Sequence, residues 1–249
     1  IDVPWDFLKW AKAKISYYYL CQMNFQPKAL FFDWDHTLWD HDLNAREVLL
    51  DLAVEYEFDI EPESYWATFE KINNGLWDQY AAGEISQSEL REIRFVRFFE
   101  EVGIQGPAQE FGDKYLERAP RKTNLMPGAF ELIQDLAEHF PLYILTNGFD
   151  DIQYVKIEGA GMRSFFKEII TSQQVGTKKP NPQFFHYALT RAGIQAEEAL
   201  MIGDHVEADV RGALQVGIPA IHYNPFSMET DLPHEIQHLD ELRALLKNR

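Results

Sequence analysis

The stretch Ala29-Leu30-Phe31-Phe32-Asp33-Trp34-Asp35-His36-Thr37-Leu38 decides the fold, because an apolar run here ends in two acidic residues. The apolar run predicts a strand. Side chains two residues apart on an extended chain point to the same side, so Asp33 and Asp35 are expected to face one small site. Two carboxylates so close repel each other unless a cation or a shared proton intervenes. A turn or helix cap is the simpler interpretation of this segment alone, and the rest of the chain argues against it.

Composition is typical of a globular protein. The 249 residues are 46% hydrophobic, enough for one substantial core with an inserted subdomain or for two modest domains. No stretch approaches the roughly 20 consecutive apolar residues that cross a bilayer. The single cysteine, Cys21, excludes an internal disulfide framework. We therefore expect a protein of the reducing cytoplasm.

The charge balance excludes two classes of partner. The 40 acidic and 23 basic residues give a net charge of −17, which repels nucleic-acid backbones and anionic membranes. We therefore expect neither as a partner. The same field opposes phosphorylated small molecules, so a site for them needs its own local positive charge. A metal ion is the obvious supplier.

Strand and helix patterns alternate after the turn signal Pro127-Gly128. This alternation predicts a parallel sheet with right-handed crossovers. We therefore expect an α/β fold with a Rossmann-like parallel sheet core. The expected strands are 142–146, 168–171, 199–202 and 220–223, and the expected helices are 129–140, about 150–159, 182–192 and 206–216.

The segment between the first strand and this block has a helical pattern. Apolar side chains recur there at helical spacing, as in Phe69, Ile72, Leu76, Trp77 and Tyr80. We expect an all-helical cap subdomain over 45–123, inserted into a core formed by 23–44 and 124–249. Such an insertion is able to lie over the carboxyl ends of the strands, where open α/β sheets bind ligands. Residues 1–22 are expected to be an extension of uncertain origin before Met23.

Three further polar clusters lie at the ends of expected strands. Taken singly, each reads as a turn, a solvated pair of charges or an acidic residue at a helix start. Taken together and in this order, they are a strong signal. They are Thr146-Asn147-Gly148, Lys178-Lys179-Pro180-Asn181-Pro182, and Gly203-Asp204 followed by Asp209.

With Asp33-x-Asp35-x-Thr37, these clusters resemble the four motifs of the haloacid dehalogenase superfamily in its phosphatase division. The resemblance extends from Phe25 to the end of the chain. Shorter stretches resemble the pyrimidine 5'-nucleotidase-like branch, which has a helical cap. These stretches are Asn73 to Tyr80, Arg94-Phe95, Thr146 to Phe149 and Lys179 to Pro182.

The resemblance implies a covalent phosphatase mechanism. Asp33 is expected to attack phosphorus and form an aspartyl-phosphate, which divides one hard displacement into two easier ones. Asp35 is expected to protonate the leaving oxygen and then to take a proton from the hydrolytic water. Mg²⁺ is expected on the Asp33 and Asp204 carboxylates and the Asp35 backbone carbonyl.

The remaining motif residues are expected to serve the phosphoryl group. Thr146, Lys179 and the Asn147 backbone N–H would hold its oxygens. Asp209 is expected to support Lys179 or a metal-bound water. Only the register of the Lys-Pro pair favours Lys179 over its neighbour Lys178. For Glu207, near Asp204, a helix-start carboxylate is preferred over a role near the metal.

The cap is expected to select the substrate. Asn73, Trp77 and Arg94 are the candidate contacts. Trp77, Tyr80 and Phe95 could stack on a nucleobase, but aromatic residues at helical spacing are usually core, and packing is preferred for Trp77 and Tyr80. A surface ion pair explains Arg94 equally well.

These residues predict a Mg²⁺-dependent phosphatase for nucleoside 5'-monophosphates, with pyrimidine ones favoured. The alternative is a generalist sugar-phosphate or phosphoglycolate phosphatase. The core motifs do not distinguish the two, because they recognise only the phosphoryl group. A 2-haloacid dehalogenase would keep Asp33 but has no use for an acid at Asp35 or a metal ligand at Asp204. A non-catalytic binding module would usually have lost a catalytic residue, and none is missing. The sequence leaves the oligomeric state open.

Overall fold

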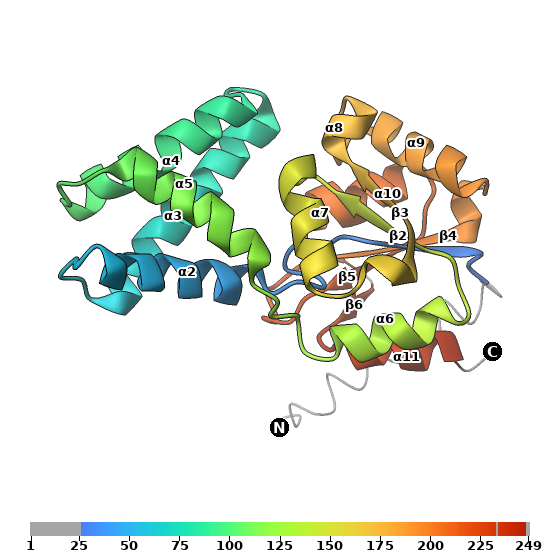
Figure 1. Cartoon of the computed structure of the whole chain (residues 1–249). Coiled ribbons are helices and arrows are strands. Elements are labelled where there is room, and N and C mark those ends of the chain that lie inside the picture. Colours follow the sequence, from blue (N-terminus) through green and yellow to red (C-terminus); the bar gives the residue numbers. More distant parts are fainter. Residues whose placement is uncertain (1–25, 233, 248–249) are drawn as a thin grey trace, which may run out of the picture. The chain divides into compact units, whose positions relative to one another are not determined.

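The computed structural model describes residues 26–232 and 234–247, so the expectation for residues 1–22 lies outside the described residues. The chain forms two compact units (Figure 1). Of the described residues, the core unit comprises 26–40 and those from Asn124 onward, and the cap unit comprises His41–Thr123. The cap unit begins at His41 rather than at 45, because its first helix starts there.

The core unit contains a six-stranded sheet in the order β3-β2-β1-β4-β5-β6, with every neighbouring pair parallel (Figure 1). This confirms the expected α/β fold with a parallel sheet. Two strands, β2 and β5, have the expected limits. The short sixth strand was not expected. The strands are β1 Ala29–Phe32, β2 Leu142–Thr146, β3 Phe166–Thr171, β4 Ala199–Gly203, β5 Ala220–Tyr223 and β6 Glu235–Ile236.

Helices cover both faces of this sheet. Leu30 and Phe32 of β1 belong to an apolar cluster with α6 and α11, whereas Phe31 belongs to a second cluster with α9 and α10. Because both faces are buried, β1 is apolar throughout. The helices are α6 Ala129–Ala137, α7 Asp150–Gly159, α8 Ser172–Val175, α9 Pro182–Ala192, α10 Gly212–Gln215 and α11 Leu239–Lys247, with 3-10 turns η2 Arg163–Phe165 and η3 Ala196–Glu198.

The helix expected over 206–216 is replaced by two shorter segments. A π-helix, η4 (Val206–Arg211), precedes α10. The His205 ring Nδ1 accepts the Ala208 N–H at 3.1 Å, and the Asp209 carboxylate accepts the His205 N–H at 3.1 Å. These side-chain bonds cap the first turn. Its backbone keeps the bond from the Asp209 N–H to the His205 carbonyl at 2.9 Å and adds a longer one from the Val210 N–H at 3.4 Å, and Asp209 is buried. The helix expected over 129–140 ends at Ala137.

The cap unit is helical, as its sequence pattern predicted. Its elements are α2 His41–Glu55, α3 Pro62–Ala82, α4 Gln87–Val102, α5 Ala108–Arg118 and the 3-10 turn η1 Ala119–Arg121. Aromatic rings form much of its core, including Tyr65, Phe69, Phe95, Phe98, Phe99, Phe111 and Tyr115. In the described ranges, no helix of either unit has the length and apolar character to cross a bilayer.

Candidate active site

The candidate site lies at the carboxyl ends of three neighbouring strands of the core unit. Asp33 follows β1, Thr146 ends β2 and Asp204 follows β4. β1 lies between β2 and β4, and the chain passes from β3 at one edge back to β4 on the other side of β1. This change of direction is a topological switch point, where open α/β sheets bind ligands.

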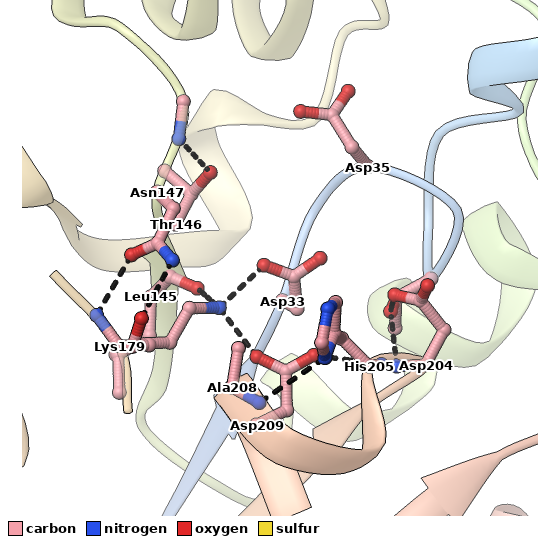
Figure 2. Close-up of polar contacts among 12 residues, drawn as sticks. Asp33, Asp35, Leu145, Thr146, Asn147, Lys179, Asp204, His205, Ala208 and Asp209 are labelled. Atoms are coloured by element: carbon pink, nitrogen blue, oxygen red, sulfur yellow. Dashed lines mark hydrogen bonds and ion pairs between the residues drawn. The ribbon is translucent and has the colours of Figure 1, made fainter. Parts of the chain in front are cut away.

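A buried lysine joins two of the carboxylates (Figure 2). Lys179 Nζ lies 2.6 Å from Asp33 Oδ1 and 2.6 Å from Asp209 Oδ1, and it donates to the Leu145 carbonyl at 2.6 Å. Burial lowers the pKa of Lys179, but the charges of Asp209 and Asp33 outweigh burial and leave the pKa raised. Lys179 is therefore a fixed cation. The neighbouring Lys178 is only half-buried, in agreement with the preferred register.

Asp33 and Asp204 have the properties of metal ligands. One oxygen from each of Asp33, Asp204 and Asp209 lies within 4.8 Å of the others. Burial raises the pKa of Asp33, and Asp209 and Asp204 raise it further against the opposing charge of Lys179. Burial and the charge of Asp209 raise the pKa of Asp204 to about 7. A hard divalent cation would relieve this repulsion, and carboxylate oxygens are the ligands that Mg²⁺ takes, so the residues fit the ion.

Asp204 is held from two sides. The Thr37 hydroxyl donates to Asp204 Oδ1 at 2.9 Å and accepts the Asp204 N–H at 3.1 Å. Nε2 of the fully buried His222 lies 2.8 Å from the Asp204 backbone oxygen, and its Nδ1 lies 3.2 Å from Glu235. Sequence reasoning missed His222, because a histidine inside a strand carries no local sign of a partner elsewhere in the chain.

Asp209 is committed to protein contacts. Its Oδ1 accepts from Lys179, and its Oδ2 accepts from the His205 N–H. The Asp209 carboxylate lies directly against Gly203. A Cβ at position 203 would lie 2.3 Å from Asp209 Oδ2, which explains the glycine at the end of β4. With both oxygens occupied, Asp209 is suited to supporting Lys179.

Asp35 has a separate set of partners. Its Oδ1 lies 2.6 Å from Lys156 Nζ, and its Oδ2 accepts from Gln153 Nε2 at 2.6 Å. Figure 2 shows its carboxylate directed away from the Asp33–Lys179–Asp209 group. Sequence reasoning missed both partners. They lie on α7, in the core unit, and a lysine on a helix gives no local sign of burial.

Hydrogen bonds fix the segment Thr146-Asn147-Gly148 and join it to Lys179. The Thr146 hydroxyl oxygen accepts from the Gly148 N–H at 3.0 Å and from Gln153 Nε2 at 3.1 Å. Its own hydrogen therefore remains for an acceptor such as a phosphoryl oxygen. The Asn147 side chain accepts from the Lys179 N–H at 2.8 Å and donates to the Lys179 carbonyl at 3.0 Å.

Glu207 has the simpler of its two expected roles. It is exposed and pairs with Arg211 at 2.6 Å across one turn of η4. Such a pair is a surface ion pair and has little influence on stability. The structure therefore gives no support for Glu207 near the metal.

Asn73 and Arg94 are buried in the cap unit, each 6% exposed. Burial lowers the pKa of Arg94, and the nearby Arg91 lowers it further against the opposing influence of Tyr115. Within residues 26–232 and 234–247, no carboxylate pairs with Arg94, and its buried Nε has no acceptor. The surface ion pair that the sequence left open for Arg94 is therefore wrong.

The three cap aromatics differ in their surroundings. Phe95 is 2% exposed and stacks on Phe69 with ring centroids 5.6 Å apart, so it is core. Trp77 and Tyr80 are half-buried and contact each other edge to face at 5.7 Å. They lie outside the apolar cluster of the cap unit. The preferred expectation that both belong to the core is wrong.

Comparison with known proteins identifies the family. A model of haloacid dehalogenase-like hydrolases matches residues 27–217. The HAD-hydrolase YfnB of Bacillus subtilis is 32% identical over 225 residues, which cover 88% of this chain and 95% of that protein. The crystal structure of YfnB bound to magnesium has a TM-score of 0.82 at 31% identity and covers 89% of this chain and 99% of that one.

Two pyrimidine 5'-nucleotidases are also similar. PynA of Streptococcus pneumoniae is 32% identical, and the match covers 81% of this chain and 86% of PynA. YjjG of Escherichia coli is 28% identical, and the match covers 80% of this chain and 87% of YjjG. These matches confirm the resemblance drawn from the four motifs and its pyrimidine 5'-nucleotidase-like branch. The chain belongs to the haloacid dehalogenase-like hydrolases.

Proposed function

We propose that this protein is a Mg²⁺-dependent phosphatase that removes the phosphate of nucleoside 5'-monophosphates, pyrimidine ones above all. The observation that carries the phosphatase is the Asp33–Lys179–Asp209 group beside Asp204, which unites a nucleophile, a fixed cation and metal ligands at one switch point. Two relatives named as pyrimidine 5'-nucleotidases support the choice of substrate.

Asp33 is the proposed nucleophile. Lys179 holds its Oδ1, and its Oδ2 accepts no hydrogen bond from the part of the chain that the structure describes. That oxygen attacks phosphorus, and the bond from phosphorus to the ester oxygen breaks as Asp35 gives its proton to the leaving alcohol. Water then attacks the aspartyl-phosphate and gives a proton to Asp35, which releases phosphate and restores Asp33.

The other site residues bind and orient the phosphoryl group. Lys179 and the Thr146 hydroxyl are its proposed donors within the core, with the Asn147 backbone N–H as a third. Asp33, Asp204 and the Asp35 backbone carbonyl would hold Mg²⁺. When bound, the ion offsets the negative charge of two carboxylates and of the incoming phosphoryl group. Asp209 keeps Lys179 in place.

The cap unit supplies the proposed substrate selectivity. Arg94 is a buried cation whose Nε has no acceptor among the described residues, and a buried donor left unpaired is costly. A pyrimidine ring carries carbonyl oxygens that can accept from a guanidinium, and the amide of Asn73 can both donate and accept. Trp77 is half-buried and offers an apolar surface to a base. These residues are therefore the proposed contacts for the nucleoside.

A substrate screen with purified protein tests this function. UMP, GMP, a sugar phosphate, phosphoglycolate and 2-chloropropionate are each assayed with Mg²⁺ and with EDTA. We expect Mg²⁺-dependent phosphate release, with the largest kcat/KM for UMP. Equal values for all the phosphate esters would favour the generalist phosphatase, and chloride release without phosphatase activity would overturn the proposal.

A further inference from the structure

His222 is a fully buried histidine that lies outside the four family motifs. It belongs to β5, and in the parallel register it pairs with Gly203, the residue before Asp204. A buried polar ring is costly unless it is hydrogen-bonded. Here the ring Nε2 lies 2.8 Å from the Asp204 backbone oxygen. Because a carbonyl oxygen only accepts, Nε2 carries the hydrogen and donates it.

Glu235 contacts the other side of the same ring. It is the register partner of His222 on the short strand β6, and its Oε1 lies 3.2 Å from His222 Nδ1. The Thr230 hydroxyl donates to the same glutamate oxygen. The backbone N–H of His222 donates to the His234 carbonyl at 2.9 Å. Both ring nitrogens and the backbone of His222 therefore have partners, which hold the ring in one orientation.

The peptide that joins Asp204 to His205 is held at both of its polar groups. Its carbonyl accepts from His222, and its N–H donates to Asp209 Oδ2 at 3.1 Å. Since a peptide is planar, these two bonds together fix its rotation. Asp209 binds Lys179 through its other oxygen. The contact with His222 therefore helps to set the backbone from which the Asp204 carboxylate extends.

Thr37, the motif residue that contacts Asp204, acts on other atoms. Its hydroxyl accepts the Asp204 N–H and donates to Asp204 Oδ1, so it holds the preceding peptide and the carboxylate. The carbonyl side is held by His222. Loss of the ring donor would release that side, and a buried carbonyl that loses its donor favours a rotated peptide. A rotated peptide would displace the carboxylate.

We propose that His222, held by Glu235, is a positioning residue that aligns Asp204 for binding Mg²⁺. The inference rests on the metal site of the proposed phosphatase. His222 acts through the Asp204 backbone and needs no contact with the ion or the substrate. Removal of groups that hydrogen-bond to metal ligands weakens metal binding about 10- to 100-fold. Loss of the Nε2 donor should therefore lower the affinity for Mg²⁺.

The test compares two amide variants by isothermal titration calorimetry with Mg²⁺ and without substrate. The amide nitrogen of glutamine reaches about as far as histidine Nε2, whereas asparagine is one methylene shorter and reaches about as far as Nδ1. We expect His222→Gln to bind Mg²⁺ within about 3-fold of the wild type, and His222→Asn to bind it about 10-fold more weakly. Equal affinities of the two variants would overturn the inference.

Two further variants separate positioning from a loss of stability. Ile221→Val removes a buried methylene of the same strand, in the apolar cluster with α6 and α11, and should lower the melting temperature without changing Mg²⁺ affinity. Glu235→Ala should weaken Mg²⁺ binding about 3-fold alone and cause no further loss in a His222→Asn background. A 10-fold weaker affinity in Ile221→Val, or a full further loss in the double variant, would contradict the proposed role.

A measurement on the metal-free protein examines the peptide itself. Hydrogen exchange of the His205 N–H, which donates to Asp209, is followed by NMR. We expect this exchange to be about 10-fold faster in His222→Asn than in His222→Gln, because the carbonyl of the same peptide has lost its donor. The Leu30 N–H of β1 should exchange equally in both variants. Equal exchange at His205 would overturn the positioning role.

The outcomes also distinguish this inference from the proposed phosphatase. The expected difference in Mg²⁺ affinity in a protein that hydrolyses no ester would refute only the phosphatase. Mg²⁺-dependent hydrolysis with wild-type Mg²⁺ affinity in His222→Asn would refute only the role of His222. Absence of Mg²⁺ binding by the wild type would overturn both the metal site and this inference.

Discussion

Lys179 in the core unit and Arg94 in the cap unit are both buried cations, 3% and 6% exposed, but their surroundings are opposite. Lys179 has two carboxylates and a backbone carbonyl within 2.6 Å. Arg94 has no carboxylate partner among the residues described. The core unit therefore already has its charges arranged for chemistry on a phosphoryl group. The cap unit carries a buried charge for which a ligand is the proposed acceptor.

Removal of the metal should have the largest effect on this arrangement. Asp33 and Asp204 remain crowded carboxylates without a divalent cation, and they repel the phosphoryl group. We expect EDTA to lower kcat/KM for UMP at least about 10³-fold, because metal ions stabilise charge by several kcal/mol. Added Mg²⁺ should restore it. Full activity in metal-free buffer would contradict the requirement for a divalent cation.

Loss of the acid should come next. Asp35→Asn keeps the Asp33 nucleophile but removes the proton donor, so kcat for UMP should fall about 10²–10⁴-fold. The loss on p-nitrophenyl phosphate should be much smaller, because its leaving group needs less protonation. Circular dichroism confirms that the variant is folded. Equal losses on both esters would end the case for Asp35 as general acid.

Arg94→Met tests the cap side of the comparison. A hydrogen bond to a charged group contributes about 1.5–3 kcal/mol, so kcat/KM for UMP should fall about 10- to 100-fold, mainly through KM. The rate on p-nitrophenyl phosphate should be unchanged. Arg97→Met, on the exposed face of the same helix, is the matched control and should change neither rate.

The same variant also distinguishes recognition from structure. Since Arg94 has no intramolecular ion pair in the described chain, its removal takes away an uncompensated buried charge. We expect the melting temperature of Arg94→Met to equal or exceed that of the wild type. A lower melting temperature with unchanged KM would assign Arg94 to the cap core.

Stabilisation by Mg²⁺ should depend on pH, and this is the smallest of the expected effects. The pKa of Asp204 is raised from 3.8 to about 7, so the folded metal-free protein binds protons more tightly than the unfolded chain. That contribution to stability is complete below the unfolded pKa and is lost as pH rises through about 7. Protons compete with Mg²⁺ for the same oxygens.

The gain in melting temperature on adding Mg²⁺ should therefore grow with pH. We expect about 5 °C at pH 8 and less than half of that at pH 5, measured by thermal unfolding with saturating Mg²⁺. Asp204→Asn should remove most of the gain. An equal gain at both pH values would contradict a site made of ionised carboxylates.

The sequence predicted the parts that depend on local pattern. The limits of β2 and α7 were predicted correctly, because apolar runs and turn residues mark them. The motif residues follow strands, so parallel pairing brings Asp33, Thr146 and Asp204 to one edge of the sheet.

What the sequence did not predict depends on long-range packing. Lys156 and His222 lie inside regular elements, where nothing nearby distinguishes them from ordinary helix and strand residues. The π-helix η4 lies where an α-helix was expected, and the side chains of His205 and Asp209 hydrogen-bond at its first turn, which the residue pattern does not indicate. The sequence also does not indicate that Arg94 is buried with no carboxylate partner in the described part of the chain, since surface ion pairs show the same residue pattern.

The most direct test of the central claim is chemical trapping of a phosphoryl group on Asp33. The wild type and Asp33→Asn are mixed with UMP and Mg²⁺, quenched in acid and reduced with borohydride, which converts a phosphorylated aspartate to homoserine. Peptide mass spectrometry then locates the change. We predict homoserine at position 33 in the wild type only, together with a loss of turnover of at least about 10⁴-fold in Asp33→Asn. Substantial turnover by Asp33→Asn, or turnover by the wild type without modified Asp33, would contradict the covalent mechanism.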